Sequence, residues 1–246
     1  MPTYKSYCWS LGTTSFRMVE FNRKIERQLE LIREFWTKPA FADQQWSENE
    51  PLQIEYYNFL KESDFIEGEA QRRAKDAREK TSGLVDLGLL DDERRLTEAG
   101  NALLQIAANA DFNTNNLLQI PADSFVYLKQ LLKLYSPIDN RYVRPYIVLI
   151  MALNSLGKLS YDEFTYLLPL SINKSKTEEI FTSIETIRSG IGTIDETIIK
   201  VLMDMPNYQE ALDILLNNAI SEQLITEIGM NRKSRNYDKP YFKLYK

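Results

Sequence analysis

An amphipathic helix near the start of the chain is the sequence feature that most restricts the fold. Between Val19 and Trp36, large apolar side chains recur every three or four residues, with Lys and Glu on the opposite side: Phe21, Ile25, Leu29, Ile32 and Trp36. This spacing matches the period of a helix that buries one face. It favours a mainly α-helical fold.

Further helices are expected along the rest of the chain. Pro51 suits the first helical position of one helix, and small residues at three- to four-residue spacing, including Ala70, Ala74 and Ala77, predict another from about Glu69. Gly157 is expected to end an apolar helix, after which Ser160 and Glu163 form a capping pair that opens the next helix. The helix that begins at Pro51 is predicted to cover residues 51–60, and the apolar helix that Gly157 ends is predicted to cover residues 146–156. Three more helices are predicted at residues 175–187, 194–203 and 208–220.

Two β-hairpins are expected among these helices. The segment 88–100 combines Gly88, a charged tip and a short extended stretch before a new helix, and the alternating segments 224–228 and 241–245 flank a basic tip. A helix, hairpin and helix in this order are typical of a winged helix. We therefore expect tandem winged-helix-like domains at residues 1–118 and 119–246, with the polar stretch 113–116 near their boundary.

Composition excludes several kinds of catalytic site. The 246 residues include no histidine, which rules out serine–histidine and cysteine–histidine nucleophile pairs and every histidine metal site. Cys8 is the only cysteine, so no intrachain disulfide or thiolate cluster can form. The longest apolar run, Tyr146 to Leu153, is too short to cross a bilayer. A cytoplasmic protein without a membrane partner is expected.

The motifs of nucleotide-binding and nuclease sites are also missing. The sequence contains no Walker A loop and no complete GxGxxG motif. Many metal-dependent nucleases use a Glu-x-Lys or Asp-x-Lys pair, and no acidic residue here is followed two positions later by lysine. The acidic cluster Asp91, Asp92 and Glu93 is expected to be a structural turn. We therefore predict no catalytic residue, no metal ligand and no cofactor in this chain.

A basic helix segment is the strongest candidate for a binding site. The net charge of the chain is −5, yet residues 71–80 hold five basic and two acidic side chains. The basic residues are Arg72, Arg73, Lys75, Arg78 and Lys80. With the alanines turned to the core, these side chains can reach phosphates or base edges in a major groove. The alternative is a solvated surface helix with internal ion pairs.

Two further segments are candidates for phosphate contacts. Arg232, Lys233 and Arg235 lie on the predicted tip between the last two strands, where wings commonly meet the DNA backbone. Thr14, Ser15 and Arg17 precede the first helix and can bind phosphate with the free amides of its N-terminus. A solvated tip and an ordinary capping run are the respective alternatives.

Several of these segments resemble one family of restriction enzymes. The blocks 9–17, 77–84, 97–100, 127–132 and 144–146 are similar, in this order, to the N-terminal half of AlwI-type Type IIS restriction endonucleases, a group that includes nicking enzymes. The resemblance implies winged-helix domains that recognise a short asymmetric site in double-stranded DNA as a monomer. It also implies a separate C-terminal nuclease domain or subunit that uses Mg²⁺ and is absent from this chain.

This comparison leads to a hypothesis with two alternatives. Arg72, Arg73 and Arg78 are expected to recognise guanine, while Arg17, Arg232, Lys233 and Arg235 contact phosphates. The alternatives are a stand-alone winged-helix regulator, which would bind a palindrome as a dimer, and a helical protein-interaction scaffold that does not bind DNA.

Overall fold

The computed structural model describes residues 8–9, 11, 20–138 and 141–204 of the chain. The chain divides into two compact units, one formed by residues 11–134 and the other by residues 1–10 and 135–246.

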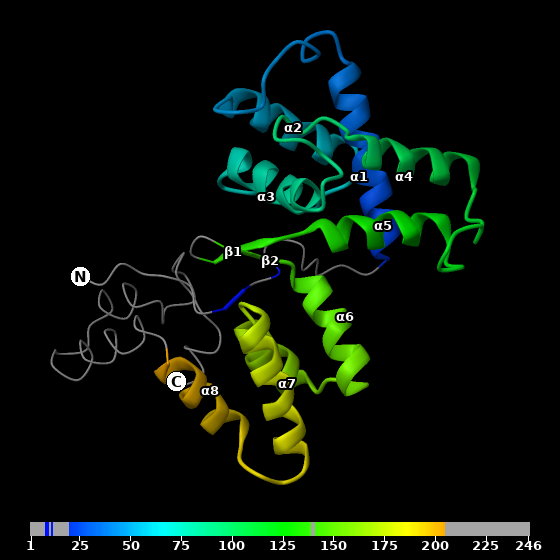
Figure 1. The fold of residues 1–246 in the computed structure, drawn as a ribbon. Helices are drawn as coiled ribbons and strands as arrows, with labels where there is room; N and C mark the ends of the chain where they lie inside the picture. Colours follow the sequence, from blue (N-terminus) through cyan, green and yellow to red (C-terminus); the bar gives the residue numbers. More distant parts are fainter. Residues whose placement is uncertain (1–7, 10, 12–19, 139–140, 205–246) are drawn as a thin grey trace, which may run out of the picture. The chain divides into compact units, whose positions relative to one another are not determined.

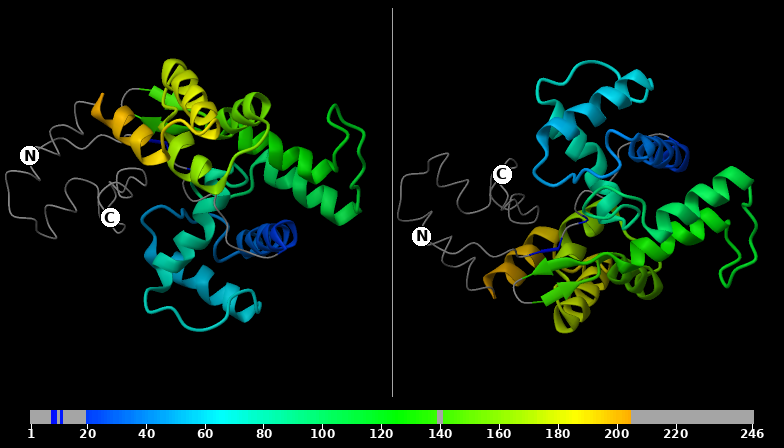
Figure 2. Two further views of the ribbon diagram at one scale, coloured as in Figure 1. Left: turned by 90° about the horizontal axis from the view of Figure 1, so that it is seen from below. Right: turned by 90° about the horizontal axis from the view of Figure 1, so that it is seen from above.

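The described residues of the unit 11–134 form five helices and one tight hairpin. The helices are α1 (Phe21–Thr37), α2 (Glu50–Glu62), α3 (Arg73–Asp86), α4 (Glu98–Asn109) and α5 (Ala122–Lys133) (Figure 1). The hairpin lies between α3 and α4 and is closed by an antiparallel bridge between Leu90 and Leu96. Helices α4 and α5 pack together and are joined by a long loop, which can be followed in Figure 2.

Local capping sets several of these helix starts. The Asn49 side chain accepts a hydrogen bond from the Leu52 amide at 3.2 Å, and Pro51 occupies the first turn of α2, as predicted. Thr97 caps α4 through the Gly100 amide at 3.3 Å. At Gly100 a Cβ atom would lie 2.3 Å from the Leu89 carbonyl oxygen, so only glycine allows α4 to approach the hairpin this closely.

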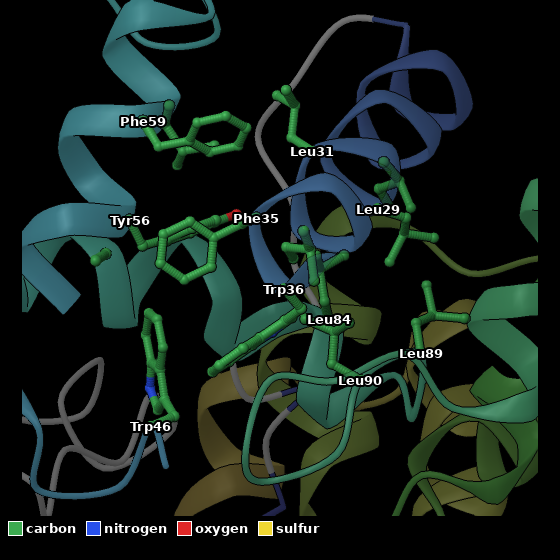
Figure 3. Packing of buried hydrophobic residues seen from close by; sticks show 14 of the residues in the cluster. Leu29, Leu31, Phe35, Trp36, Trp46, Tyr56, Phe59, Leu84, Leu89 and Leu90 are labelled. Atoms are coloured by element: carbon green, nitrogen blue, oxygen red, sulfur yellow. The ribbon is translucent and has the colours of Figure 1, made fainter. Parts of the chain in front are cut away.

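An aromatic core joins these elements (Figure 3). The Phe35 ring stacks on Phe41 at 4.5 Å and meets the edge of Tyr56 at 5.1 Å. Trp46, which precedes α2, packs edge-on against Tyr56 at 5.6 Å. Leu84 of α3 is fully buried in the same cluster. Helix α3 is thus fixed to the rest of the unit through its apolar face.

Helix α3 begins at Arg73, four residues later than predicted from the alanine spacing. Gly68 has a φ of +77°, and the Ala70 amide donates a hydrogen bond to the Tyr57 hydroxyl on α2 at 2.8 Å. Ala70 still packs on the core. The spacing therefore reported burial correctly, but a contact with another helix places residues 69–72 outside α3.

The described part of the other unit contains one small sheet and three α-helices. Strands β1 (Ser136–Ile138) and β2 (Arg141–Val143) pair antiparallel, with Ser136 opposite Val143. They are followed by α6 (Pro145–Leu156), a π-helical turn (Glu163–Leu167), a 3₁₀ turn (Leu168–Leu170), α7 (Lys174–Arg188) and α8 (Ile194–Met203). The β1–β2 hairpin was not predicted, because three-residue strands are too short to show a period.

The predicted capping pair is confirmed in this unit. The Ser160 hydroxyl accepts from the Glu163 amide at 3.2 Å, and the Glu163 carboxylate accepts from the Ser160 amide at 2.6 Å. Gly157 ends α6 with a φ of +74°, also as predicted.

The fold class of mainly α with small β-hairpins is confirmed, while the winged-helix assignment and the boundary between residues 118 and 119 stay predictions. The predicted helix 208–220 and the hairpin at 224–245 lie outside the described residues. Among the helices that the structure describes, none combines the length and apolar character needed to span a membrane.

Candidate nucleic-acid interface

Small side chains bring α3 close to its neighbours. Ala74, Ala77 and Thr81 are buried on one face, which packs against α2 and the core. The Thr81 hydroxyl donates to the Ala77 carbonyl oxygen at 3.0 Å and accepts from the Arg94 guanidinium of the hairpin at 3.0 Å. The opposite side of the helix is therefore the one left to solvent.

The structure brings all five predicted basic residues of this segment to the exposed side. They are Arg72, Arg73, Lys75, Arg78 and Lys80, and each is classed as exposed. Successive residues of a helix are turned by roughly 100° about its axis. On this basis Lys75 and Glu79 form a central row directly opposite the buried face, while Arg73 and Lys80 lie on one flank and Arg78 on the other. Arg72 directly precedes the first turn of the helix.

The two flanking arginines are oriented by α2. Arg73 donates to the Asn58 side-chain oxygen at 3.2 Å and pairs with Glu69 at 3.3 Å, with its guanidinium 5.8 Å from the centre of the Tyr57 ring. Arg78 donates to the side-chain oxygen of Gln53, which is only 3% exposed. These contacts hold both arginines beside the central row.

The other basic side chains of α3 have weaker ties. Lys75 lies 3.4 Å from Glu79, and both side chains are more than half exposed, at 53% and 63%. Such exposed pairs contribute about 0.3 to 0.5 kcal/mol. Within the residues that the structure describes, Arg72 and Lys80 form no ion pair. These two cations are thus available to bind an anion.

The hairpin after α3 uses its charged residues for internal contacts. The Glu93 carboxylate accepts hydrogen bonds from the Ser47 hydroxyl at 2.6 Å and from the Trp46 amide at 2.5 Å. These bonds, led by that from Ser47, lower the pKa of Glu93 despite some opposing desolvation. Glu93 therefore has the structural role that was expected of the acidic cluster.

The two arginines of the hairpin are also structural. Arg95 donates to the Ala42 carbonyl oxygen at 2.7 Å and lies over the Trp36 ring at 4.2 Å. Arg94 reaches Thr81 of α3, and its backbone accepts from the Trp36 indole at 2.8 Å. The hairpin thereby fixes α3 against α1 and the loop before α2.

The α2 residues that orient the flanking arginines were not predicted from the sequence. Asn58 and Gln53 lie 15 and 25 residues from Arg73 and Arg78 along the chain. No local pattern marks contacts over this separation. Glu79 was counted only as a negative charge, although its place four residues after Lys75 puts both side chains on the same row of the helix.

The remaining predicted site residues lie outside the described part of the chain: Thr14, Ser15, Arg17, Arg232, Lys233 and Arg235. In the segments that are described, no three Asp, Glu, Cys or His side chains gather in a way that could hold a metal ion.

A sequence model of one protein family matches the chain. It describes the AlwI restriction endonuclease and covers residues 83–240, which is more than half of the sequence. The chain belongs to the AlwI restriction endonuclease family. Membership assigns it a role in DNA restriction and implies that DNA is its partner.

The family match begins inside α3, so the basic residues 72–80 precede it. Searches of curated proteins and of solved structures found no match. The family match therefore assigns no role to the basic residues of α3.

Proposed function

We propose that this chain is the DNA-recognition region of a Type IIS restriction or nicking endonuclease and binds a short asymmetric site in double-stranded DNA. The single observation that carries the proposal is the exposed face of α3, which presents Arg72 and Lys80 without ion pairs among the described residues. Family membership supplies the second support, because restriction enzymes act on DNA.

In this proposal α3 enters the major groove, which is wide enough to admit a helix. Arg72, at the N-terminus of the helix, bonds O6 and N7 of a guanine. Arg73 and Arg78 were first expected to recognise guanine as well, but their ties to α2 support a different role. We assign them, together with Lys80, to the phosphates on either side of the groove.

The remaining contacts and the cutting step complete the proposal. Arg17, Arg232, Lys233 and Arg235, with Thr14 and Ser15, add phosphate contacts. Cleavage, with its Mg²⁺, belongs to a nuclease domain or subunit distinct from this recognition surface. The tandem winged-helix arrangement and binding as a monomer are parts of the same proposal.

The test is a binding selection from a randomised duplex pool at moderate salt with Mg²⁺ present, followed by sequencing of the bound molecules. We expect an asymmetric motif of a few base pairs and no cleavage. Binding should weaken with salt, with a log–log slope of about 0.9 per phosphate contact. A palindromic motif would instead indicate a dimeric regulator, and no enrichment would indicate a scaffold that does not bind DNA.

A further inference from the structure

Glu79 is a carboxylate at the centre of the exposed face of α3, which also carries Asp76 and, at the end of the helix, Asp86. It lies in the central row of α3 with Lys75, one turn after it, and its side chain is 63% exposed. Cationic residues flank this row on both sides: Arg73 and Lys80 on the side that also carries Asp76, and Arg78 on the other. A negative charge in this position opposes the approach of phosphates, so it costs affinity unless it gains a specific partner.

The position of Glu79 determines which part of DNA it can meet. When a helix lies in the major groove, its flanks face the two phosphate backbones and its central row faces the base edges. The base edges include hydrogen-bond donors, and the N4 amino group of cytosine is the one that Glu and Asp accept from. The flanking arginines, held by α2, bind the phosphates at the two sides of the groove, so the central row faces the bases.

The Glu79 carboxylate is free to exchange its present partner. Its contact with the Lys75 ammonium is 3.4 Å long and exposed to solvent, so little free energy is lost when it breaks. The Glu79 side chain makes no other contact that would hold it in place among the described residues. Lys75 can then turn to a neighbouring base or phosphate.

We propose that Glu79 recognises a C·G base pair by accepting a hydrogen bond from cytosine N4. Two kinds of base edge are then recognised at α3: Arg72 donates to the acceptors of a guanine, and Glu79 accepts from the amino group of a cytosine. This inference rests on the proposed DNA-recognition function and names a specificity residue within it.

The experiment compares the full chain with Glu79→Ala and with a matched control, Glu34→Ala, which removes an exposed glutamate from α1 of the same unit. Each protein is titrated at one salt concentration against the selected duplex, a scrambled duplex, and variants of the selected duplex with one base pair changed at a time. Circular dichroism checks that each variant is folded.

The two possible roles of Glu79 predict changes of opposite direction in the affinity for the selected duplex: a loss if Glu79 recognises cytosine, and a gain if it only repels phosphates. If it recognises cytosine, Glu79→Ala weakens binding to the selected duplex about tenfold and removes the preference at one C·G pair, while the other positions keep theirs. Binding to the scrambled duplex stays equal or becomes tighter, because a repulsive charge is gone. Glu34→Ala leaves the preference at every position unchanged.

The inference is overturned if Glu79→Ala leaves binding to the selected and scrambled duplexes unchanged, or changes both by the same factor. In that case Glu79 is only a surface charge, and the proposed function is unaffected. If the wild-type chain selects no motif at all, the proposed function itself fails.

Discussion

Helices α3 and α7 are both rich in charged residues, but they use them in different ways. In α7, Arg188 donates to both oxygens of Glu163 at 2.8 Å and to the Leu156 carbonyl oxygen at 2.9 Å. Lys176 pairs with Glu179 at 2.8 Å and with Asp204 at 3.1 Å. In α3, by contrast, Arg72 and Lys80 have no ion-pair partner among the described residues.

The difference shows that the number of charges on a helix does not identify a binding surface. Glu163 is only 7% exposed at its side chain, and the pair with Arg188 joins the ends of α6 and α7 to the π-helical turn. Arg188 and Lys176 of α7 therefore stabilise their own unit. Those at the centre of α3 stabilise little, so we expect them to act on a partner.

The largest effect that this comparison predicts is on stability. Replacing Arg188 with Ala should lower the free energy of unfolding by about 3 to 5 kcal/mol, because it leaves the buried Glu163 carboxylate without its cationic partner. Urea denaturation followed by circular dichroism measures the change. Lys174→Ala, which removes a side chain that is 90% exposed, is the control and should shift it by less than about 0.5 kcal/mol. An unchanged urea midpoint for Arg188→Ala would show that the two helices do not differ as we describe.

The next effect concerns Arg72 of α3. Arg72→Ala should weaken binding to the selected duplex by about 1 to 3 kcal/mol and relax the preference at one guanine, with no comparable loss on a scrambled duplex. Its unfolding midpoint should match that of the wild type. Equal losses on both duplexes would assign Arg72 to the phosphates instead.

Lys80→Ala should produce a smaller and uniform effect. As a phosphate contact, Lys80 adds the same affinity to every sequence, so its loss should lower the log–log salt slope by about 0.9. The matched variant on α7, Lys174→Ala, should leave both the affinity and the slope unchanged. A salt slope that falls equally for both variants would mean that α3 is not the surface that meets DNA.

The smallest effect appears in acid. The hydrogen bonds from Arg188 hold the pKa of Glu163 below its ordinary value of 4.5. This pair therefore contributes its stability above pH 4.5 and loses it as the pH falls through the lowered pKa of the folded state. Glu163→Gln should be less stable than the wild type near neutral pH, and the difference should shrink below pH 4.5. A constant difference across this range, measured by urea denaturation, would contradict the role of Glu163.

Local sequence determined most of the helices in the described part of the chain, though not α5, and where several of them begin and end. The apolar period of α1, the Asn49 cap with Pro51, the Ser160–Glu163 capping pair and the final Gly157 are signals within one or two turns of the chain. Such signals act through nearest neighbours in the sequence, so periodicity and capping rules detect them. The set of basic residues on α3 was also visible at this level.

Only the tertiary structure decided what those residues do. Contacts with α2 separate Arg73 and Arg78 from Arg72, and contacts across 46 or more residues commit Glu93 and Arg95 to the core. The start of α3 depends in the same way on the Tyr57 hydroxyl. Partners this distant leave no periodic trace in the sequence, because folding alone brings them together. Whether a charge on α3 is bound or free is therefore a property of the fold.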